Sequence, residues 1–384
     1  MAVCAIGLDE GKLGALLASR QHDTFIPISN LEFPVNKNDL VEVIRSNIDI
    51  LEEEIKLKEK KYSIEIEKIY SRLPLEWAKV KIVEDSIPLA IHKKKAITEK
   101  DIYNARKYIE NVTLDWNEIC LHNIVLEYSV DNERYFSLPH HLEGRRLGLK
   151  TLLIIMERKK FQEIYKLFDT IGRKFMGFVY TPLADISVNR GGSALTLPYV
   201  SVNIGEMYTV CSILVGNNIF YKIFEFGEIM LRRSIEDRFL LSEEISSNIL
   251  SQYISFHDSF NEKELVLKNN TNYINLSIGS VNNYIKDITS KEITAIVDFL
   301  ISQIEGTFRI LFVGKVACVA GFYEFLRKGF PALEIELPCF YSDHAHLLGC
   351  IKYGSFRYLE KVEFPRKRWW DHLSSLYTKC KDYF

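Results

Sequence analysis

The sequence predicts an α/β protein of two similar halves, with a smaller α+β unit inserted into the first half. Two openings of strand, turn and strand, at residues 3–17 and 199–215, correspond to each other. A buried strand, a glycine turn and a helix follow late in the chain, at residues 309–331. Between residues 85 and 163 the pattern favours strand, helix, strand, strand and a closing strand and helix, which is typical of a compact α+β unit.

The first half begins with two apolar runs joined by a glycine-rich turn, which predicts a hairpin at residues 3–17. Apolar residues then recur at helical spacing from Leu40 to Ile55, after an Asn/Asp start, so residues 36–61 are expected to form an amphipathic helix. Residues 62–83 alternate as a strand does until Pro74 breaks the pattern.

In the inserted unit, Thr98 and Asp101 resemble a capping box, so residues 96–112 are expected to form a helix. Strands are expected at 120–131 and 133–139. A strand followed by a helix is expected at 150–172.

Residues 197–227 of the second half indicate three consecutive strands, with turns at Gly205 and at 216–218. Helices are expected at 240–253 and 290–306, with a polar, asparagine-rich stretch at 269–283 between them. The late strand, glycine turn and helix of residues 309–331 end at Gly329 and Pro331.

Composition excludes several classes of protein. The 384 residues carry a formal net charge of −2, so no general excess of Lys and Arg exists to bind nucleic acid. The seven cysteines are scattered and never spaced as a metal pair, which favours a reducing cytoplasm. The amino terminus lacks the basic start of a signal peptide, and no apolar run is long enough to cross a bilayer. We therefore expect a cytoplasmic protein whose membrane contact, if any, is peripheral.

Two hairpins with acidic or amide residues at their tips, and a late strand-GxxxxxxG-helix, form the layout of the actin-like ATPase fold. The segment IPLAIHKKKAITEKDIYNARKYIE resembles the inserted SHS2-type subdomain of FtsA, the bacterial proteins that tether the division protein FtsZ to the membrane. The run from Ile124 to Met156 resembles the strands that follow there, and HAHLLGCIKYG resembles the helix that closes domain 1. The resemblance covers most of the chain and rests on layout more than on identity.

The resemblance implies a division of the chain into domains. Domain 1 comprises 1–84 and 164–197 and is closed by a helix at 341–363. The inserted subdomain comprises 85–163. Domain 2 comprises 198–340, with a smaller lobe at about 230–305, and residues 364–384 form a linker and an amphipathic tail.

The same resemblance implies a nucleotide site for ATP with Mg²⁺, from which this sequence departs. The first phosphate hairpin is kept, with Asp9, Gly11 and Lys12. The second has Asn203 in place of the acid, keeps only Gly205, and puts Glu206 where a phosphate should lie. Later positions also change: Gly227 is followed by Glu228, and Gly314 is followed by Lys315 in place of a second glycine. We therefore expect a weak ATPase at most, and nucleotide binding stays open.

The carboxyl terminus has the pattern of a membrane-surface helix. Five Lys and Arg residues against two Asp give the last nineteen residues a net charge of +3, and their large apolar residues fall on one helical face. The alternative is that this face packs on the protein's own core. The residues expected to bind the membrane are Arg366, Lys367, Arg368, Trp369, Trp370, Leu373, Leu376, Tyr377, Cys380 and Phe384.

The function implied by the resemblance is a non-enzymatic cell-division scaffold on the inner membrane face, which binds FtsZ and self-associates into a protofilament. The alternative is a scaffold resembling PilM of type IV pilus assembly, which binds a cytoplasmic peptide of an inner-membrane partner. A sugar kinase or Hsp70-like ATPase is disfavoured by the altered phosphate loops.

His344 and His346 lie beside Asp343 and suggest a metal pair. No third ligand lies within reach in sequence, so a polar cluster at the start of a helix is the preferred interpretation. No metal site and no catalytic residue is assigned from the sequence.

Overall fold

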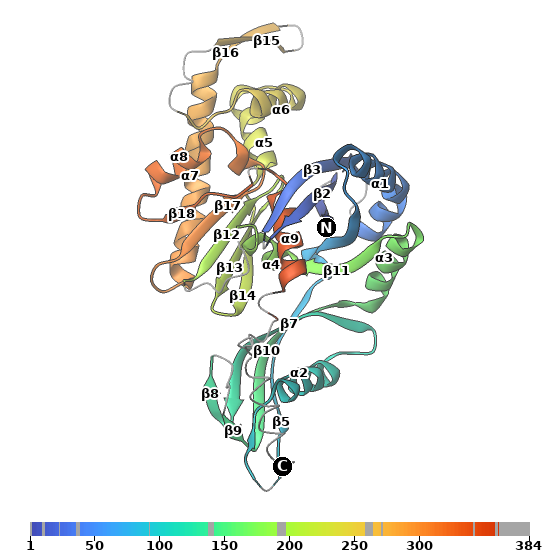
Figure 1. The fold of residues 1–384 in the computed structure, drawn as a ribbon. Helices are drawn as coiled ribbons and strands as arrows, with labels where there is room; N and C mark the ends of the chain where they lie inside the picture. Colours follow the sequence, from blue (N-terminus) through green and yellow to red (C-terminus); the bar gives the residue numbers. More distant parts are fainter. Residues whose placement is uncertain are drawn as a thin grey trace. The chain divides into compact units, whose positions relative to one another are not determined.

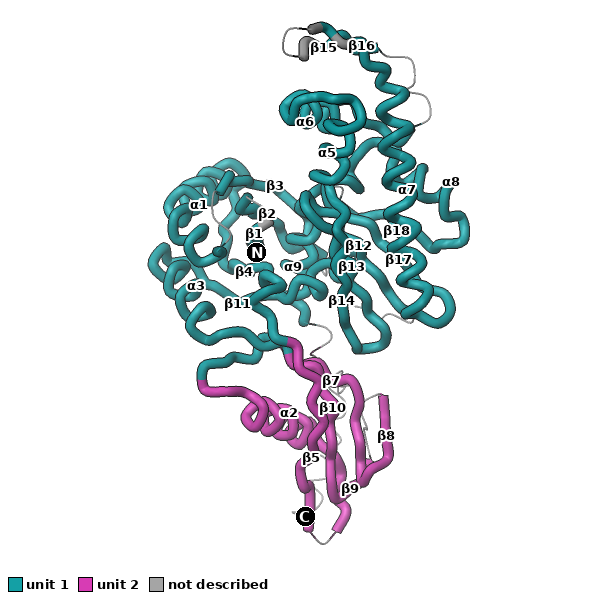
Figure 2. The backbone as a smooth tube through the Cα atoms, turned by 180° about the vertical axis from the view of Figure 1, so that it is seen from behind, with its two compact units in different colours: residues 1–79, 117–121, 154–358 teal, residues 80–116, 122–153, 359–384 magenta. Residues whose placement is uncertain are grey.

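In a computed structural model the chain folds into two compact units, drawn in separate colours in Figure 2. Unit 1 comprises residues 1–79, 117–121 and 154–358, and unit 2 the remainder. The structure describes residues 2–9, 12–22, 24–35, 39–91, 93–136, 142–189, 197–257, 264–269, 272–340, 342–357 and 360. None of the helices within these ranges is long and apolar enough to cross a membrane.

The first sheet of unit 1 has the strand order β11-β4-β1-β2-β3 (Figure 2). The first three strands form an antiparallel meander, whereas β4 pairs parallel to β1 and β11 parallel to β4. The strands are β1 (Ala2–Asp9), β2 (Lys12–Gln21), β3 (Thr24–Pro34), β4 (Ile66–Leu73) and β11 (Lys174–Tyr180).

Helices α1 (Leu40–Tyr62) and α3 (Arg158–Thr170) pack on each other beside this sheet, and α9 (Ala345–Phe356) packs on its strands. Asp39 begins α1 by accepting hydrogen bonds from two backbone amides of the first turn. The buried stripe that runs from Leu40 to Ile55 is the predicted one, so the amphipathic helix is confirmed.

The second sheet has the order β14-β13-β12-β17-β18 and repeats the pattern of the first. Here too a three-stranded antiparallel meander is extended by two parallel strands beside its first strand. The strands are β12 (Tyr199–Ile204), β13 (Thr209–Val215), β14 (Asn218–Phe224), β17 (Arg309–Val313) and β18 (Glu334–Glu336). The expected construction from two similar halves is therefore confirmed.

Four helices accompany the second sheet and share its hydrophobic core. The turn after β17 includes the short helix η2 (Val316–Cys318), and the following helix ends at Gly329 as predicted. The four helices are α5 (Glu228–Phe239), α6 (Glu243–Gln252), α7 (Ile278–Gln303) and α8 (Phe322–Gly329).

The asparagine-rich stretch expected at 269–283 is not a simple connection. It contributes to the hairpin of β15 (Glu264–Asn269) and β16 (Asn272–Ser277), which leads directly into α7 (Figure 1). That helix begins at Ile278 and not near residue 290, because the Ser277 side chain caps its first turn and Val281 and Ile285 continue the buried stripe.

The two halves of unit 1 meet where α9 packs on α4 (Thr181–Ile186). Their backbones approach so closely that a Cβ atom on Gly349 would lie 1.9 Å from the carbonyl oxygen of Ala184. Only glycine fits at this position.

The described residues of unit 2 form a four-stranded sheet of order β5-β10-β7-β8 and one helix. The helix α2 (Glu99–Thr113) begins with the predicted capping box, in which Thr98 and Asp101 satisfy each other's backbone amides. The sequence pattern groups the strand and helix of residues 150–172 with the insert. In the structure the helix of that segment, α3, lies in unit 1. The strands are β5 (Lys79–Pro88), β7 (Glu118–Val130), β8 (Glu133–Tyr135) and β10 (Arg146–Glu157), with β6 (Lys95–Ala96) paired to β9 (Glu143–Gly144), and η1 (Leu75–Trp77) precedes β5.

Candidate functional site

A cavity of about 290 Å³ lies within unit 1 and is lined by both of its halves. The first half contributes β1, β2, β3 and the end of β4, and the second contributes the ends of β12 and β17 and the β12–β13 turn. The charged and histidine side chains that line it are Lys12, Glu32, Arg72, Glu76, Glu206, Lys315, Asp343, His344 and His346.

The β12–β13 turn and the β17 turn fit together through glycine. Gly314 has φ +94°, and a Cβ atom there would lie 2.3 Å from the carbonyl oxygen of Ile204. Asn203, the last residue but one of β12, donates a 3.3 Å hydrogen bond to the buried carboxylate of Asp185. Gly205 closes the turn by donating to the carbonyl of Tyr208. These loops are therefore held in place by their own packing.

Lys315 joins three loops at this side of the cavity. Its ammonium lies 2.6 Å from a carboxylate oxygen of Glu228 and 3.4 Å from one of Glu206. Partial burial by itself lowers the pKa of Lys315, but the two carboxylates outweigh it and raise that pKa above its ordinary value. The sequence placed Glu206 where a phosphate should lie, and in the structure its carboxylate binds the lysine expected to bind nucleotide.

A second charged group lies at the side formed by the first half. Glu32 accepts from Lys12 at 3.2 Å and contacts the Nε2 atom of His344 at 2.9 Å. Partial burial tends to raise the pKa of Glu32, but the hydrogen bonds from His344 and Lys12 lower it below its ordinary value. The ammonium of Lys12 is therefore paired with an ionised carboxylate.

The fully buried carboxylate of Asp185 does not line the cavity itself, but it contacts Arg72 and Asn203, which do. Arg72 lies 3.6 Å away, and Ser212 donates a hydrogen bond to it. Burial raises the pKa of Asp185, although Arg72 and His346 act in the opposite direction. This group connects β4, α4 and the second sheet beneath the cavity.

The charge balance of the cavity does not favour a triphosphate. Each of the three Lys and Arg side chains in the lining lies within 3.6 Å of a carboxylate. ATP would have to displace those contacts and approach the four carboxylates of the lining. The described residues thus provide no surplus positive charge for a nucleotide.

The structure places the remaining residues of the expected nucleotide site as follows. Asp9 ends β1 opposite Lys12, although its side chain is not described, and Gly11 lies outside the described residues. Gly227 precedes α5 and does not line the cavity, but a Cβ atom there would lie 2.5 Å from the carbonyl oxygen of Glu206. The expected membrane-binding residues, Arg366 to Phe384, also lie outside the described residues.

The sequence interpretation missed Glu32 and the pairing of Lys315. Glu32 is 312 positions from His344, and only the folding of β3 beside the start of α9 brings them together. Glu32 lies in an alternating strand and has no local motif, so no signal in the sequence distinguishes it from an ordinary surface carboxylate.

Comparison with known proteins identifies the fold and the insert. A family model described as the SHS2 domain inserted in FtsA matches residues 78–155. No curated protein sequence matches the chain significantly.

Three solved structures resemble the whole chain, with identities that show the fold alone. A PilM–PilN type IV pilus biogenesis complex is 11% identical with a TM-score of 0.54, covering 94% of this chain and 99% of that one. The ethanolamine utilization protein EutJ of Carboxydothermus hydrogenoformans is 13% identical with a TM-score of 0.51, covering 92% and 90%. A diol dehydratase-reactivating factor is 7% identical with a TM-score of 0.51, covering 92% and 100%.

The domain match and the fold agree with the architecture that the sequence predicts. The chain has the actin-like ATPase fold, and a domain that matches the SHS2 domain inserted in FtsA lies within its first half.

Proposed function

We propose that this protein is a scaffold of the FtsA type, which links FtsZ filaments to the inner face of a cell membrane. The observation that carries the proposal is the FtsA-type SHS2 domain at 78–155 within an actin-like fold. FtsA-type proteins couple a polymer to a membrane. That role requires binding surfaces for the polymer and the membrane, and it does not require rapid ATP hydrolysis.

The cavity supports a scaffold in preference to an ATPase. Lys12 and Lys315, the two lysines expected to reach phosphates, each lie against carboxylates. We propose that the protein does not hydrolyse ATP efficiently, and that ATP with Mg²⁺ binds weakly at most. A phosphate-release assay with wild-type protein tests this, and turnover at rates typical of enzymes, about 1 s⁻¹ or more, would contradict it.

Within this proposal the charged tail is the membrane anchor. Each basic residue near an anionic surface contributes about 1 kcal/mol, and helix ordering consumes part of that gain. One tail therefore binds weakly, and attachment becomes stable when a protofilament presents many tails together.

The second domain, 198–340, supplies the partner surface in this proposal. Its smaller lobe at about 230–305 would bind FtsZ, and self-association would align the tails along one filament. Helices α5, α6 and most of α7 belong to this lobe. Both roles come from the resemblance to FtsA-type proteins.

Co-sedimentation with anionic liposomes is the decisive test. We expect the full chain to sediment, and a chain ending at Phe364 and a Trp369→Glu, Leu373→Glu variant to stay in solution. The matched control is Ser374→Glu, Ser375→Glu, which adds the same charge off the apolar face and should lose less binding. Equal behaviour of all four proteins would refute membrane anchoring by the tail.

The second candidate is a pilus-type scaffold that binds a cytoplasmic peptide of an inner-membrane protein. It is favoured by the likeness over nearly the whole length to the PilM–PilN type IV pilus biogenesis complex. Pull-down separates the two, because the first predicts retention of purified FtsZ and the second predicts retention of a cytoplasmic peptide of an inner-membrane protein.

A further inference from the structure

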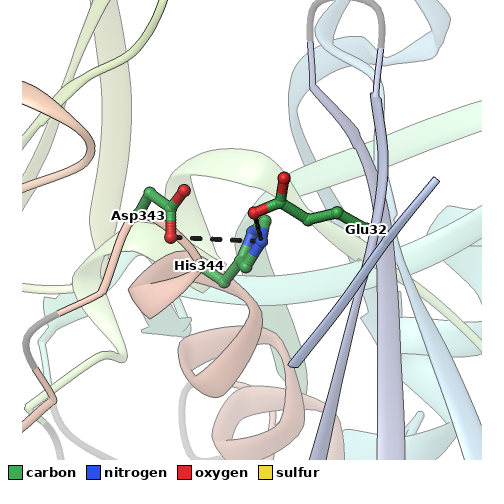
Figure 3. A group of neighbouring side chains, drawn as sticks. All are labelled: Glu32, Asp343 and His344. Atoms are coloured by element: carbon green, nitrogen blue, oxygen red, sulfur yellow. Dashed lines mark hydrogen bonds and ion pairs between the residues drawn. The ribbon is translucent and has the colours of Figure 1, made fainter. Parts of the chain in front are cut away.

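Three side chains with metal-binding atoms converge at the side of the cavity formed by β3 and the start of α9 (Figure 3). They are Glu32 on β3 and Asp343 and His344 immediately before α9. One ligand atom from each lies within 4.8 Å of the other two. Among the described residues this is the group of histidine and carboxylate side chains close enough to share one ion.

The spacing is close to that of a metal site without its ion. The Nε2 atom of His344 lies 2.9 Å from Glu32 and 4.0 Å from Asp343. Ligands about 2.0 Å from a tetrahedral Zn²⁺ lie about 3.3 Å apart, so these two distances need to change by less than about 1 Å. The distance between Glu32 and Asp343, which is at most 4.8 Å, needs to change by no more than about 1.5 Å. One imidazole and two carboxylates form a donor set that Zn²⁺ accepts, leaving a position for water.

The surrounding residues hold two of the three ligands in position. His344 is a buried residue, with a side chain 6% exposed, and its ring packs against the backbone of Gly14. A Cβ atom on Gly14 would lie 3.0 Å from that ring. The hydroxyl of Ser342 donates to Asp343 and accepts from the backbone amide of His344. Such outer contacts orient metal ligands in proteins.

The Nδ1 atom of the His344 ring has no hydrogen-bond partner among the described residues. A metal ion bound at Nε2 requires the imidazole proton to lie on Nδ1, and this limits the affinity without abolishing it.

Lys12 now supplies the positive charge at this position. Its ammonium contacts one oxygen of Glu32 while His344 contacts the other. A divalent cation between Glu32 and His344 would repel that ammonium and displace it toward the open cavity. The lysine therefore competes with the metal, and its removal should increase the affinity.

We propose that Glu32, Asp343 and His344 form a binding site for a divalent transition-metal cation, of which Zn²⁺ is the best fit, independent of nucleotide. Binding fastens β3 to the start of α9 and stabilises the first half of unit 1. This role goes beyond the proposed scaffold function and does not depend on it.

The test is isothermal titration of the full, chelator-treated chain with ZnCl₂ alone. We expect one equivalent to bind, and Glu32→Gln and His344→Gln each to weaken binding by more than about 100-fold. The matched control is Glu76→Gln, which removes a carboxylate of the same cavity outside the group and should bind as wild type does. Wild-type affinity in both ligand variants, or an equal loss in the control, would overturn the proposal.

Two further measurements keep the proposal testable if a ligand variant folds poorly. Co²⁺ should give the visible absorption of a tetrahedral site containing nitrogen and oxygen, and Glu32→Gln should abolish it. Lys12→Met keeps all three ligands and should bind Zn²⁺ at least about 10-fold more tightly, because the competing charge is gone. Weaker binding by Lys12→Met would contradict the site.

Discussion

Removal of the Lys315 ammonium tests whether ion pairs hold the cavity loops together. Lys315 lies between Glu206, on the β12–β13 turn, and Glu228, at the start of α5. Lys315→Met keeps an unbranched, mostly apolar side chain, one atom shorter, and removes the ammonium group. The two carboxylates then face each other without a cation between them.

The cost can be worked out from the two contacts of 2.6 and 3.4 Å. Because both carboxylate oxygens contact the same ammonium nitrogen, they lie no farther apart than about 6 Å, the sum of the two distances. Two like charges at about 6 Å repel by about 3 kcal/mol when the effective dielectric constant is about 20. All three side chains are about 30% exposed, so solvent screening reduces this value. We expect Lys315→Met to lower the free energy of unfolding by about 1–2 kcal/mol.

Urea unfolding of four proteins measures the effect: wild type, Lys315→Met, Glu228→Gln and the double variant. In the Glu228→Gln background the lysine substitution should cost less than about 0.5 kcal/mol, because the second charge of the repelling pair is absent. An equal cost of Lys315→Met in both backgrounds would show that packing, and not charge, explains its effect. Increased stability of the single variant would refute the reasoning altogether.

The remaining predictions concern backbone contact and pH. In a thermal unfolding assay, Gly349→Ala should lower the free energy of unfolding by about 3 kcal/mol, because its Cβ atom would lie 1.9 Å from the carbonyl oxygen of Ala184. The control, Gly329→Ala, should be nearly neutral, because a Cβ atom there would have no atom within 4 Å. The hydrogen bond from Arg173 holds the pKa of Glu59 below its ordinary value of 4.5, despite partial burial. Its contribution to stability is therefore complete above pH 4.5 and is lost as pH falls through the lower folded-state pKa. Urea unfolding of wild type and Glu59→Gln from about pH 6 to about pH 3 measures this contribution. The variant should be less stable than wild type near pH 6, and the difference should shrink toward pH 3. A difference that stays constant with pH would show that it does not come from the ionised Glu59 carboxylate.

The fold follows largely from local signals in the sequence. The hairpins at 3–17 and 199–215 were predicted because apolar runs and turn residues act over a few positions, and both appear with the expected antiparallel register. The start of α7 at Ile278 was not predicted, because polar residues between its apolar positions obscure the periodicity.

The site was predicted in part only. The loops at Asn203, Gly205 and Gly314 were identified through the resemblance to FtsA-type proteins, and these three residues do line the cavity. The partners of Lys315 and His344 were not, since contacts across 87 and 312 positions depend on how distant segments fold together within each half. Sequence spacing contains no information about such distances.

The contact of Gly349 with Ala184 also constrains how unit 1 can deform. Helix α9 packs on strands of the first sheet, and α4 packs on strands of the second. The contact between these two helices therefore joins the two halves. Since the backbones touch there without intervening side chains, α9 and α4 cannot approach further. Any motion of one half against the other therefore has to pivot about this contact or slide along it.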